Sequence, residues 1–360
     1  MKYFILSVFI LTILTACNDN QEKIPSDSFV SQINEHRDKR QFYLRIWDDF
    51  SAEYVLTLDS LKNIQPKNVQ IVDLIGDDEL SFFLENLRQY QFLEAIRITQ
   101  ASVNEGIFDS LINKLSPKKH FKKLILWSCN IENVPASISK LKNLESLDLP
   151  YNHIKRLPPE IGSLKKLKML RLHSNPQFES LPVEIGLLEN LEHLDFAGTK
   201  ISQIPSTIGG CKNLINLTAN ACKITHIPKT LGRCMSLKWL NFGANKITEI
   251  PDEVGNLHQL VVLSLGMNRI KTLPDSFQKL TKLDFFDISN NQLSKFPSQV
   301  LTFHKVVNLW VHKNSFNRIP IELADLENLR QFLVDESEIL KSDVEAIKNK
   351  NPIINFVSRY

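Results

Sequence analysis

The chain has 360 residues, of which 43% are hydrophobic and 23% charged, a composition typical of a soluble globular fold. Its 43 basic and 40 acidic residues leave a net charge of only +3, and its densest basic run, at residues 118–123, is interrupted by a histidine and a phenylalanine. These properties give nucleic-acid binding little support. Only 11 glycines and no run rich in Ser, Gly or Pro argue against a long flexible linker between folded parts.

The N-terminal sequence MKYFILSVFILTILTAC predicts a secretory signal peptide. One lysine precedes a charge-free, mostly apolar run at residues 3–14, which is about half the length needed to span a bilayer. The letters LTAC at residues 14–17 resemble a bacterial lipobox, in which Cys17 is lipidated and becomes the mature N-terminus. We therefore expect removal of residues 1–16, a lipid anchor on Cys17 that holds the protein to a membrane, and a polar tether at residues 17–40. An ordinary signal peptide with a chance cysteine is the alternative.

The residues after the lipobox bear on which membrane carries the anchor. Asn18 departs from the Asp-after-Cys pattern associated with inner-membrane retention in enteric bacteria, so we expect the outer membrane. Asp19 and Glu22 resemble the export signals of surface lipoproteins in Bacteroidota. The anchored domain is therefore expected to face either the periplasm or the outside of the cell.

Residues 41–120 are predicted to form an N-terminal cap followed by irregular, helix-bearing repeats. Two β-like runs, YLRIW and YVLTL, are expected to close the N-terminal end. The apolar spacing at residues 69–74 and at residues 93–98 predicts two strands. Helical patterns follow these strands at residues 79–90 and 105–115.

Residues 121–328 contain nine copies of one pattern with a period of 23 residues, one copy being a residue longer. Its first half has the spacing LxxLxLxxNxI and its second half LPxxIxxL, as in LESLDLPYNHIKRLPPEIGSLKK, which begins at Leu144. A fixed period in the twenties is the sequence signature of a solenoid. The copies begin at Phe121, Leu144, Leu167, Leu191, Leu214, Leu237, Leu260, Leu283 and Val306.

Each half of the unit has a physical role. The LxxLxL half predicts a short strand with leucines on one face, and stacked copies form a parallel sheet with a shared core. The asparagine ends the strand and bonds the backbone of adjoining turns; Cys129, Thr199 and Cys222 replace it with small groups that can still donate. The proline starts a helical turn on the outer side. Because strands pack more tightly than these outer segments, the stack is expected to curve with its sheet inside.

This unit resembles the leucine-rich repeat, in the 23-residue LPxxI form that is similar to Ras-binding leucine-rich repeat scaffolds of eukaryotic cells. The resemblance covers residues 121–328 and implies an α/β solenoid. This is a right-handed horseshoe with a concave parallel β-sheet and short helical or 3-10 turns on the convex side. It also implies partner binding on the sheet as the usual activity.

A C-terminal repeat and cap are predicted for residues 329–360. The apolar spacing predicts a last strand at residues 329–334. A helix capped by Ser342 is expected to run to Lys348, and a final strand is expected at residues 353–357. Such caps cover the core that a terminal coil would otherwise expose.

The third, fifth and seventh positions of each unit are expected on the concave face, with the eighth at its rim. Three of the four tryptophans fall on this face, and tryptophan is over-represented in binding hot spots. Small seventh positions from Ala197 to Ser289 predict a shallow trough, and we expect the main contact surface between Trp239 and Trp310. The alternative is that these rings only pack on neighbouring strands. The candidate partner-binding residues are Trp127, Tyr151, Met169, His173, His193, Asp195, Trp239, Phe285, Asp287, Trp310 and His312.

No catalytic constellation is present in the sequence: it has no glycine-rich phosphate loop, Cys-x-x-Cys pair, His-Glu-x-x-His motif or nucleophile elbow. His173, His193 and Arg171 form a polar patch on adjacent strands, where only Asp195 could serve as a third metal ligand. We expect solvated side chains there rather than a metal, no cofactor, and no enzymatic activity.

The cysteines of the repeats leave one question open. Cys211 and Cys234 occupy the same position in adjacent units, where they are either two buried hydrophobic residues or, in an oxidising compartment, a disulfide. Cys129 and Cys222 lie four units apart and cannot reach each other.

The sequence therefore predicts a monomeric module, lipid-anchored to the bacterial envelope, that binds a protein or peptide on its concave sheet. One alternative is a surface protein that contacts carbohydrate, with its aromatic rings stacked on sugars, or that acts in adhesion. Another is a cytoplasmic signalling scaffold, which requires that the leader is not cleaved.

Overall fold

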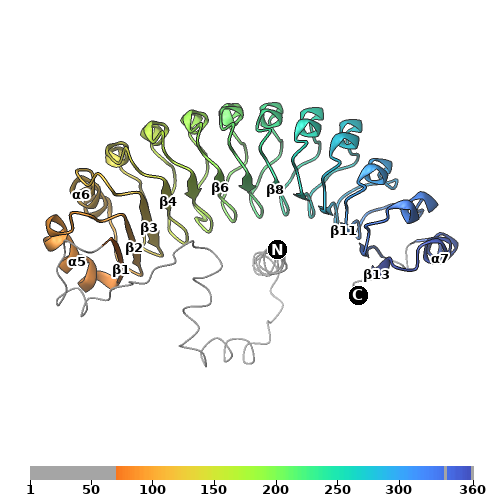
Figure 1. Ribbon diagram of the computed structural model, residues 1–360, viewed down its shortest axis with the longest axis horizontal. Coiled ribbons are helices and arrows are strands. Elements are labelled where there is room, and N and C mark those ends of the chain that lie inside the picture. Colours follow the sequence, from red (N-terminus) through yellow and green to blue (C-terminus); the bar gives the residue numbers. More distant parts are fainter. Residues whose placement is uncertain (1–69, 336–338, 358–360) are drawn as a thin grey trace, which may run out of the picture.

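The computed structural model describes residues 70–335 and 339–357. In this part of the chain, thirteen parallel strands form one sheet in sequence order, and the coils make an arc with strands inside and helical turns outside (Figure 1). The signal peptide, Cys17, the tether at residues 17–40 and the two runs YLRIW and YVLTL lie outside the described residues. None of the described helices is long and apolar enough to cross a membrane.

The first two described units carry full helices, as the sequence predicted. Helix α6 has the predicted bounds, and the Asn104 side chain caps it by accepting a hydrogen bond from Ile107 N at 3.0 Å. Helix α5 starts three residues earlier than predicted, because Gly76 at φ 82° turns the chain directly out of β1. The elements are β1 (Ile71–Ile75), α5 (Gly76–Asn86), η3 (Leu87–Gln89), β2 (Ala95–Thr99) and α6 (Glu105–Leu115).

The nine regular units each contain one short strand on the inside and one 3-10 turn on the outside. The strands are β3 (Lys123–Trp127), β4 (Ser146–Asp148), β5 (Met169–Arg171), β6 (His193–Asp195), β7 (Asn216–Thr218), β8 (Trp239–Asn241), β9 (Val262–Ser264), β10 (Phe285–Asp287) and β11 (Asn308–Trp310). The turns are η4 (Ala136–Lys140), η5 (Pro159–Ser163), η6 (Val183–Leu187), η7 (Ser206–Gly210), η8 (Lys229–Arg233), η9 (Asp252–Asn256), η10 (Asp275–Lys279), η11 (Ser298–Thr302) and η12 (Ile321–Asp325). The motif proline precedes every turn in extended backbone, and its carbonyl accepts the first hydrogen bond of the turn.

The ninth-position asparagines link successive coils inside the stack. Asn152 Oδ1 accepts hydrogen bonds from Cys129 N at 2.8 Å and Ile131 N at 3.1 Å, and its Nδ2 donates to Leu126 O at 2.8 Å. Thr199 and Cys222 still donate, both to Phe196 O, which confirms the predicted replacement of asparagine by a small donor. Asn175, Asn245, Asn268, Asn291 and Asn314 make the corresponding bonds.

A left-handed backbone at the eighth position was not predicted. In all nine regular units this residue has φ between 51° and 68°, although only one of the nine is glycine. The conformation costs a non-glycine residue about 1–2 kcal/mol, and the bonds between coils offset it. Tyr151 N, for example, donates to His173 O at 3.1 Å, and Met267 N donates to Ser289 O at 2.8 Å. The direction of each rim side chain is therefore set by the backbone.

The C-terminal end contains β12 (Gln331–Leu333), α7 (Lys341–Lys350) and β13 (Asn355–Val357). The prediction that Ser342 caps the helix is wrong, because α7 begins at Lys341 after Leu340, and no side chain caps it. Asp343 of the first turn is turned to the preceding coil, where it pairs with Arg318 at 2.8 Å. The helix also ends two residues later than predicted.

The four cysteines of the repeats are free and buried. Cys211 Sγ donates to Ile185 O at 3.2 Å, and Cys234 Sγ donates to Ile208 O at 3.3 Å. Burial raises the pKa of Cys211 to about 12 and that of Cys234 to about 11. In this structure the pair therefore serves as two small buried residues, and no disulfide joins them.

Candidate binding face on the concave sheet

The register of the strands aligns equivalent positions of neighbouring units. Trp239 pairs with Asn216 on one side and Val262 on the other, and the same pairing continues along the sheet. Adjacent strands lie about 4.8 Å apart, so each position forms a row of side chains across the concave face. This arrangement confirms that period-2 alternation sorts the third, fifth and seventh positions onto one face.

Exposure along these rows is far from uniform. Ile125 is 5% exposed, Asp287 8% and His312 9%, so these three side chains are buried although they point away from the leucine core. Inward curvature brings side chains of adjacent strands together, and they cover one another. Trp127 and Tyr151 are 45% and 46% exposed. The other candidates are intermediate, namely Met169, His173, His193, Asp195, Trp239, Phe285 and Trp310.

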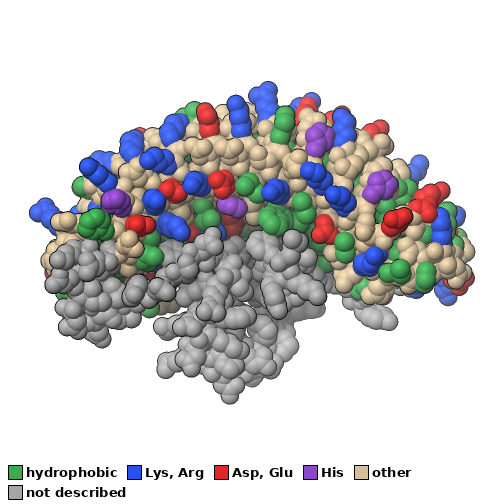
Figure 2. Space-filling view, in the orientation of Figure 1, with side chains coloured by type: hydrophobic (Ala, Val, Ile, Leu, Met, Phe, Trp, Pro, Cys, Tyr) green, Lys and Arg blue, Asp and Glu red, His purple; other side chains and the backbone are tan. Residues whose placement is uncertain are grey.

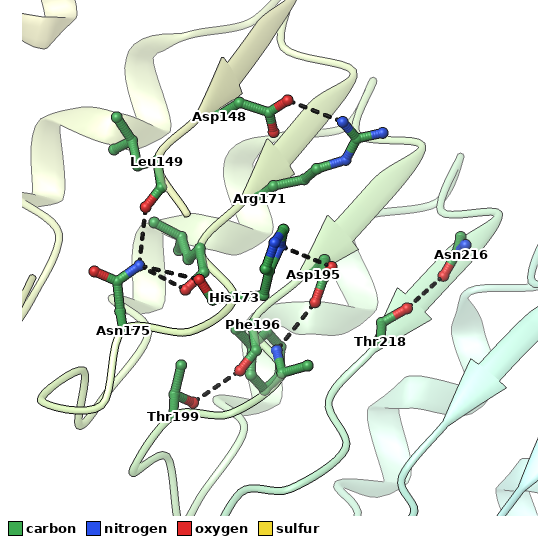
Figure 3. A network of polar contacts seen from close by, with 12 residues as sticks. Asp148, Leu149, Arg171, His173, Asn175, Asp195, Phe196, Thr199, Asn216 and Thr218 are labelled. Carbon is green, nitrogen blue, oxygen red and sulfur yellow. Dashed lines mark hydrogen bonds and ion pairs between the residues drawn. The ribbon is translucent and has the colours of Figure 1, made fainter. Parts of the chain in front are cut away.

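Four candidate residues from β3 to β6 form one connected cluster, the N-terminal patch: Trp127, Tyr151, His173 and Asp195. The rings of Trp127 and Tyr151 stack with centroids 5.4 Å apart and planes 5° apart. The ring of His173 meets that of Tyr151 edge-on, with centroids 5.6 Å apart. Its Nδ1 lies 3.2 Å from Asp195 Oδ2, a contact that is marked in Figure 3. The left-handed backbone of Tyr151, at φ 55°, brings its ring to the rim. Rings from three coils thus make one continuous surface.

Polar side chains beside this patch are paired with one another, across two strands for Arg171 and Asp148 and within β7 for Thr218 and Asn216. Arg171 Nη1 donates to Asp148 Oδ2 at 2.9 Å, and Thr218 Oγ1 donates to Asn216 Oδ1 at 3.0 Å (Figure 3). Burial of the His193 ring, with the positive charge of Arg171, lowers the pKa of His193 and favours its neutral form. Within residues 70–335 and 339–357, no three His, Cys, Asp or Glu side chains come together as metal ligands.

The C-terminal patch comprises Trp239, Phe285, Asp287, Trp310 and His312. Phe285 and Trp310, on adjacent strands, meet edge-on with ring centroids 4.8 Å apart. These rings therefore contact each other and offer a partner only part of their surface.

Asp287 fills part of the expected trough, which corrects the sequence prediction. Its carboxylate accepts hydrogen bonds from Ser289 Oγ at 2.6 Å, Ser289 N at 2.9 Å and Ser264 Oγ at 3.1 Å. It lies over Gly266, where a Cβ atom would come within 2.5 Å of Asp287 Oδ2. The small seventh position thus accommodates a neighbouring carboxylate, and Asp287 presents little surface to a partner.

The structure also contains a surface that the sequence analysis missed. Lys200, Lys223, Lys246 and Arg269 are the tenth residues of four consecutive units, and all four are exposed. We call this row the basic rim. Its signal in the sequence is a positive charge every 23 residues, which a search for contiguous basic runs does not detect.

Three family models match the chain. The model described as "Leucine-rich repeat region" matches residues 225–349, and two described as "Leucine rich repeat" match residues 119–177 and 190–211. No curated protein matches the chain.

Many solved structures share the fold at low sequence identity. A TDR receptor is 24% identical with a TM-score of 0.62, over 74% of this chain and 46% of the receptor. TLR13, solved as a complex with ssRNA13, is 23% identical with a TM-score of 0.64, over 78% of this chain and 43% of TLR13. An internalin from Listeria monocytogenes is 19% identical with a TM-score of 0.50, over 79% of this chain and 95% of the internalin. The chain spans less than half of the first two, and all three show likeness of fold alone.

Proposed function

Because the chain is a leucine-rich repeat protein, we propose that it is a non-enzymatic module that binds a protein or peptide partner on its concave face. One observation carries this proposal: the stacked rings of Trp127 and Tyr151 are almost half exposed. Large aromatic side chains in that position gain free energy when a partner buries them, and they lose little conformational entropy. The N-terminal patch is therefore the proposed anchor of the partner.

The face between the two patches suits a polypeptide. Its middle strands present Asn216, Thr218 and Asn241, which are short neutral donors and acceptors. Groups of this kind can bond the amides of an extended peptide chain. Each candidate carboxylate is already paired or hydrogen-bonded, as at Asp195 and Asp287, so none of them is an isolated charge that a partner must desolvate.

The His173–Asp195 pair supports binding rather than catalysis. A hydrolytic triad needs a hydroxyl or thiol within hydrogen-bond reach of the imidazole. Among the described residues, no Ser, Thr or Cys side chain hydrogen-bonds to His173, whose ring is held between Asp195 and Tyr151. Asp195 thus orients the His173 ring, which is the last ring in the series from Trp127 through Tyr151.

The binding test uses a peptide selected from a random displayed library on the wild-type protein. We expect Trp127→Ala/Tyr151→Ala to weaken that peptide roughly tenfold to a hundredfold, the usual effect of removing hot-spot rings. The matched control is Val183→Ala/Leu187→Ala, because these side chains are 59% and 49% exposed on the outer turns. Equal loss in both variants, or no loss in the first, would contradict the proposal. Selective binding of glycans by the wild type, lost in the first variant, would favour the carbohydrate alternative.

We further propose that the module is anchored to the bacterial envelope, most simply to the outer membrane, through a lipid on Cys17. The support is the apolar leader that ends in LTAC. Labelled palmitate should enter the wild type but not Cys17→Ser, and protease treatment of intact cells should show whether the module faces outward. An unlabelled wild type would remove this proposal and favour the cytoplasmic scaffold.

A further inference from the structure

The basic rim borders the concave face along the ends of strands β6 to β9. Each of its four residues directly follows the ninth position that closes the strand, for example Lys246 after Asn245. These coils form the middle of the arc in Figure 1, between the labels β6 and β8 and just beyond. The row is therefore central, and it belongs to the edge of the proposed binding surface.

A backbone ladder holds the four residues at a regular spacing. Lys223 N donates to Ile201 O at 2.9 Å, and Arg269 N donates to Ile247 O at 2.8 Å. Lys200 N and Lys246 N make the same bond to the coil before them. With coils about 4.8 Å apart, the four Cα positions span only about 14 Å.

Within the described part of the chain, no acidic side chain neutralises the charges of the rim. No described carboxylate forms an ion pair with any of the four, and the tenth positions of flanking units include the uncharged Gln292. Glu249 lies three residues after Lys246 without pairing with it. Figure 2 shows one face of the molecule, on which acidic and basic side chains are interspersed. The rim thus concentrates one sign of charge in a chain whose net charge is only +3.

We propose that the basic rim binds an acidic segment, rich in Asp or Glu, of the polypeptide that occupies the concave face. This inference rests on the proposed function, and it names the partner class. Alternate side chains of an extended peptide repeat about every 6.6 Å, so a row of cations about 14 Å long faces about three carboxylates. Met267, 40% exposed at the eighth position beside Arg269, makes the rim continuous with the concave face.

The surroundings of the rim favour a polypeptide over other polyanions. Proteins that lie on a membrane surface place apolar side chains beside their cations. At the eighth positions of these four units Met267 is the single large apolar side chain, whereas Val183, Leu187 and Met235 are exposed on or next to the outer turns. Single-stranded nucleic acid is held by aromatic stacking beside the phosphate-binding cations. The eighth positions of these four units are Gly198, Ala221, Ala244 and Met267, with no aromatic ring.

The test compares two variants with equal loss of charge. The rim variant is Lys200→Gln/Lys223→Gln/Lys246→Gln/Arg269→Gln. The control, Lys142→Gln/Lys212→Gln/Lys279→Gln/Lys305→Gln, also removes four exposed cations that lack ion pairs. The probe is a fluorescein-labelled peptide of twelve glutamates, measured by anisotropy in 50 mM NaCl. We expect the rim variant to bind it at least about tenfold more weakly and the control to stay within about twofold, with 500 mM NaCl removing most of the wild-type binding.

Three results would overturn the inference: equal loss in both variants, no loss in the rim variant, or rim-dependent binding of oligo(dT) or phosphatidylglycerol vesicles that exceeds binding of the peptide. The variant Trp127→Ala/Tyr151→Ala separates this inference from the proposed function. If this aromatic variant loses binding of the library-selected peptide while the rim variant still binds the glutamate peptide, the rim inference is refuted and the proposed function stands. If the aromatic variant still binds the selected peptide while the rim variant loses the glutamate peptide, the proposed function is refuted and the rim inference stands.

Discussion

The ninth-position asparagines allow the coupling between coils to be measured, and Asn268→Ala is the most informative change. Asn268 is 8% exposed, and its Oδ1 accepts the hydrogen bond of Ile247 N at 3.0 Å. Its Nδ2 donates to Phe242 O and Leu265 O at 2.9 Å each, and to Gly266 O at 3.3 Å. One side chain thus serves four backbone groups in two adjacent coils.

The expected cost follows from which of these groups keep a partner. Phe242 O still accepts from Asn245, Leu265 O from Asn291, and Gly266 O from Ala244 N. Only the buried Ile247 N–H is left without an acceptor, which costs about 1–3 kcal/mol. Adding a few tenths of a kcal/mol for each weakened carbonyl, we expect Asn268→Ala to lower the free energy of unfolding by about 2–4 kcal/mol.

The double variant Asn268→Ala/Asn291→Ala tests the reasoning more sharply. Leu265 O then loses both side-chain donors, so the pair should cost about 1–2 kcal/mol more than the sum of the single variants. Asn268→Ala/Asn314→Ala is the control, because these two side chains share no carbonyl, and it should be additive within about 0.5 kcal/mol.

Urea unfolding followed by circular dichroism gives the energies, and hydrogen exchange at Ile247 reports the local loss, since each coil contacts mainly its neighbours. Additivity in the adjacent pair would refute the shared-carbonyl account.

Three further predictions concern single sites. Gly186→Ala should lower the free energy of unfolding by about 1–3 kcal/mol in a urea titration, because its Cβ would lie 2.2 Å from Thr207 O. Gly106→Ala in α6 is the control: its Cβ meets only a contact at 3.5 Å, so this change should be neutral or stabilising. Cys211, with its pKa raised by burial to about 12, should not react with Ellman's reagent at pH 8 until the protein is unfolded; rapid reaction of the native protein would contradict its placement. Burial lowers the pKa of His193 below its ordinary value of 6.5, which favours the neutral ring in the folded protein. The contribution of His193 to stability should therefore be complete above pH 6.5 and be lost as the pH falls below 6.5. A midpoint at or above 6.5 in a proton NMR titration of His193 would contradict this prediction.

The solenoid of strands and outer turns could be predicted because each coil repeats the same short sequence pattern. Leucines at period 2 make a strand that only a stacked copy can bury, and the proline and isoleucine half makes the outer turn. Even the substitutions at Thr199 and Cys222 could be interpreted, because the donor function needs one short polar group. Local chemistry was sufficient wherever a residue acts mainly within its own coil.

The predictions failed where a residue's state depends on the coil beside it. The local sequence around Tyr151 and Met267 does not predict a left-handed backbone at these residues. Hydrogen bonds to the next coil stabilise that conformation. Ser342 has the chemistry of a helix cap, but the chain enters α7 at Lys341, where Asp343 is drawn to Arg318 of the preceding coil. Such choices are made by contacts across about 23 residues, which a local pattern does not contain.

The candidate surface divides in the same way. The sequence by itself determined the rows, because alternation assigns each side chain to a face and the repeat sets its position along the sheet. Only the tertiary structure decided which members remain accessible: Trp127 and Tyr151 stay exposed, while Asp287 folds over Gly266 and is buried. The physical reason is that curvature and the size of the neighbouring side chain set exposure, and that neighbour is one full coil away in the sequence.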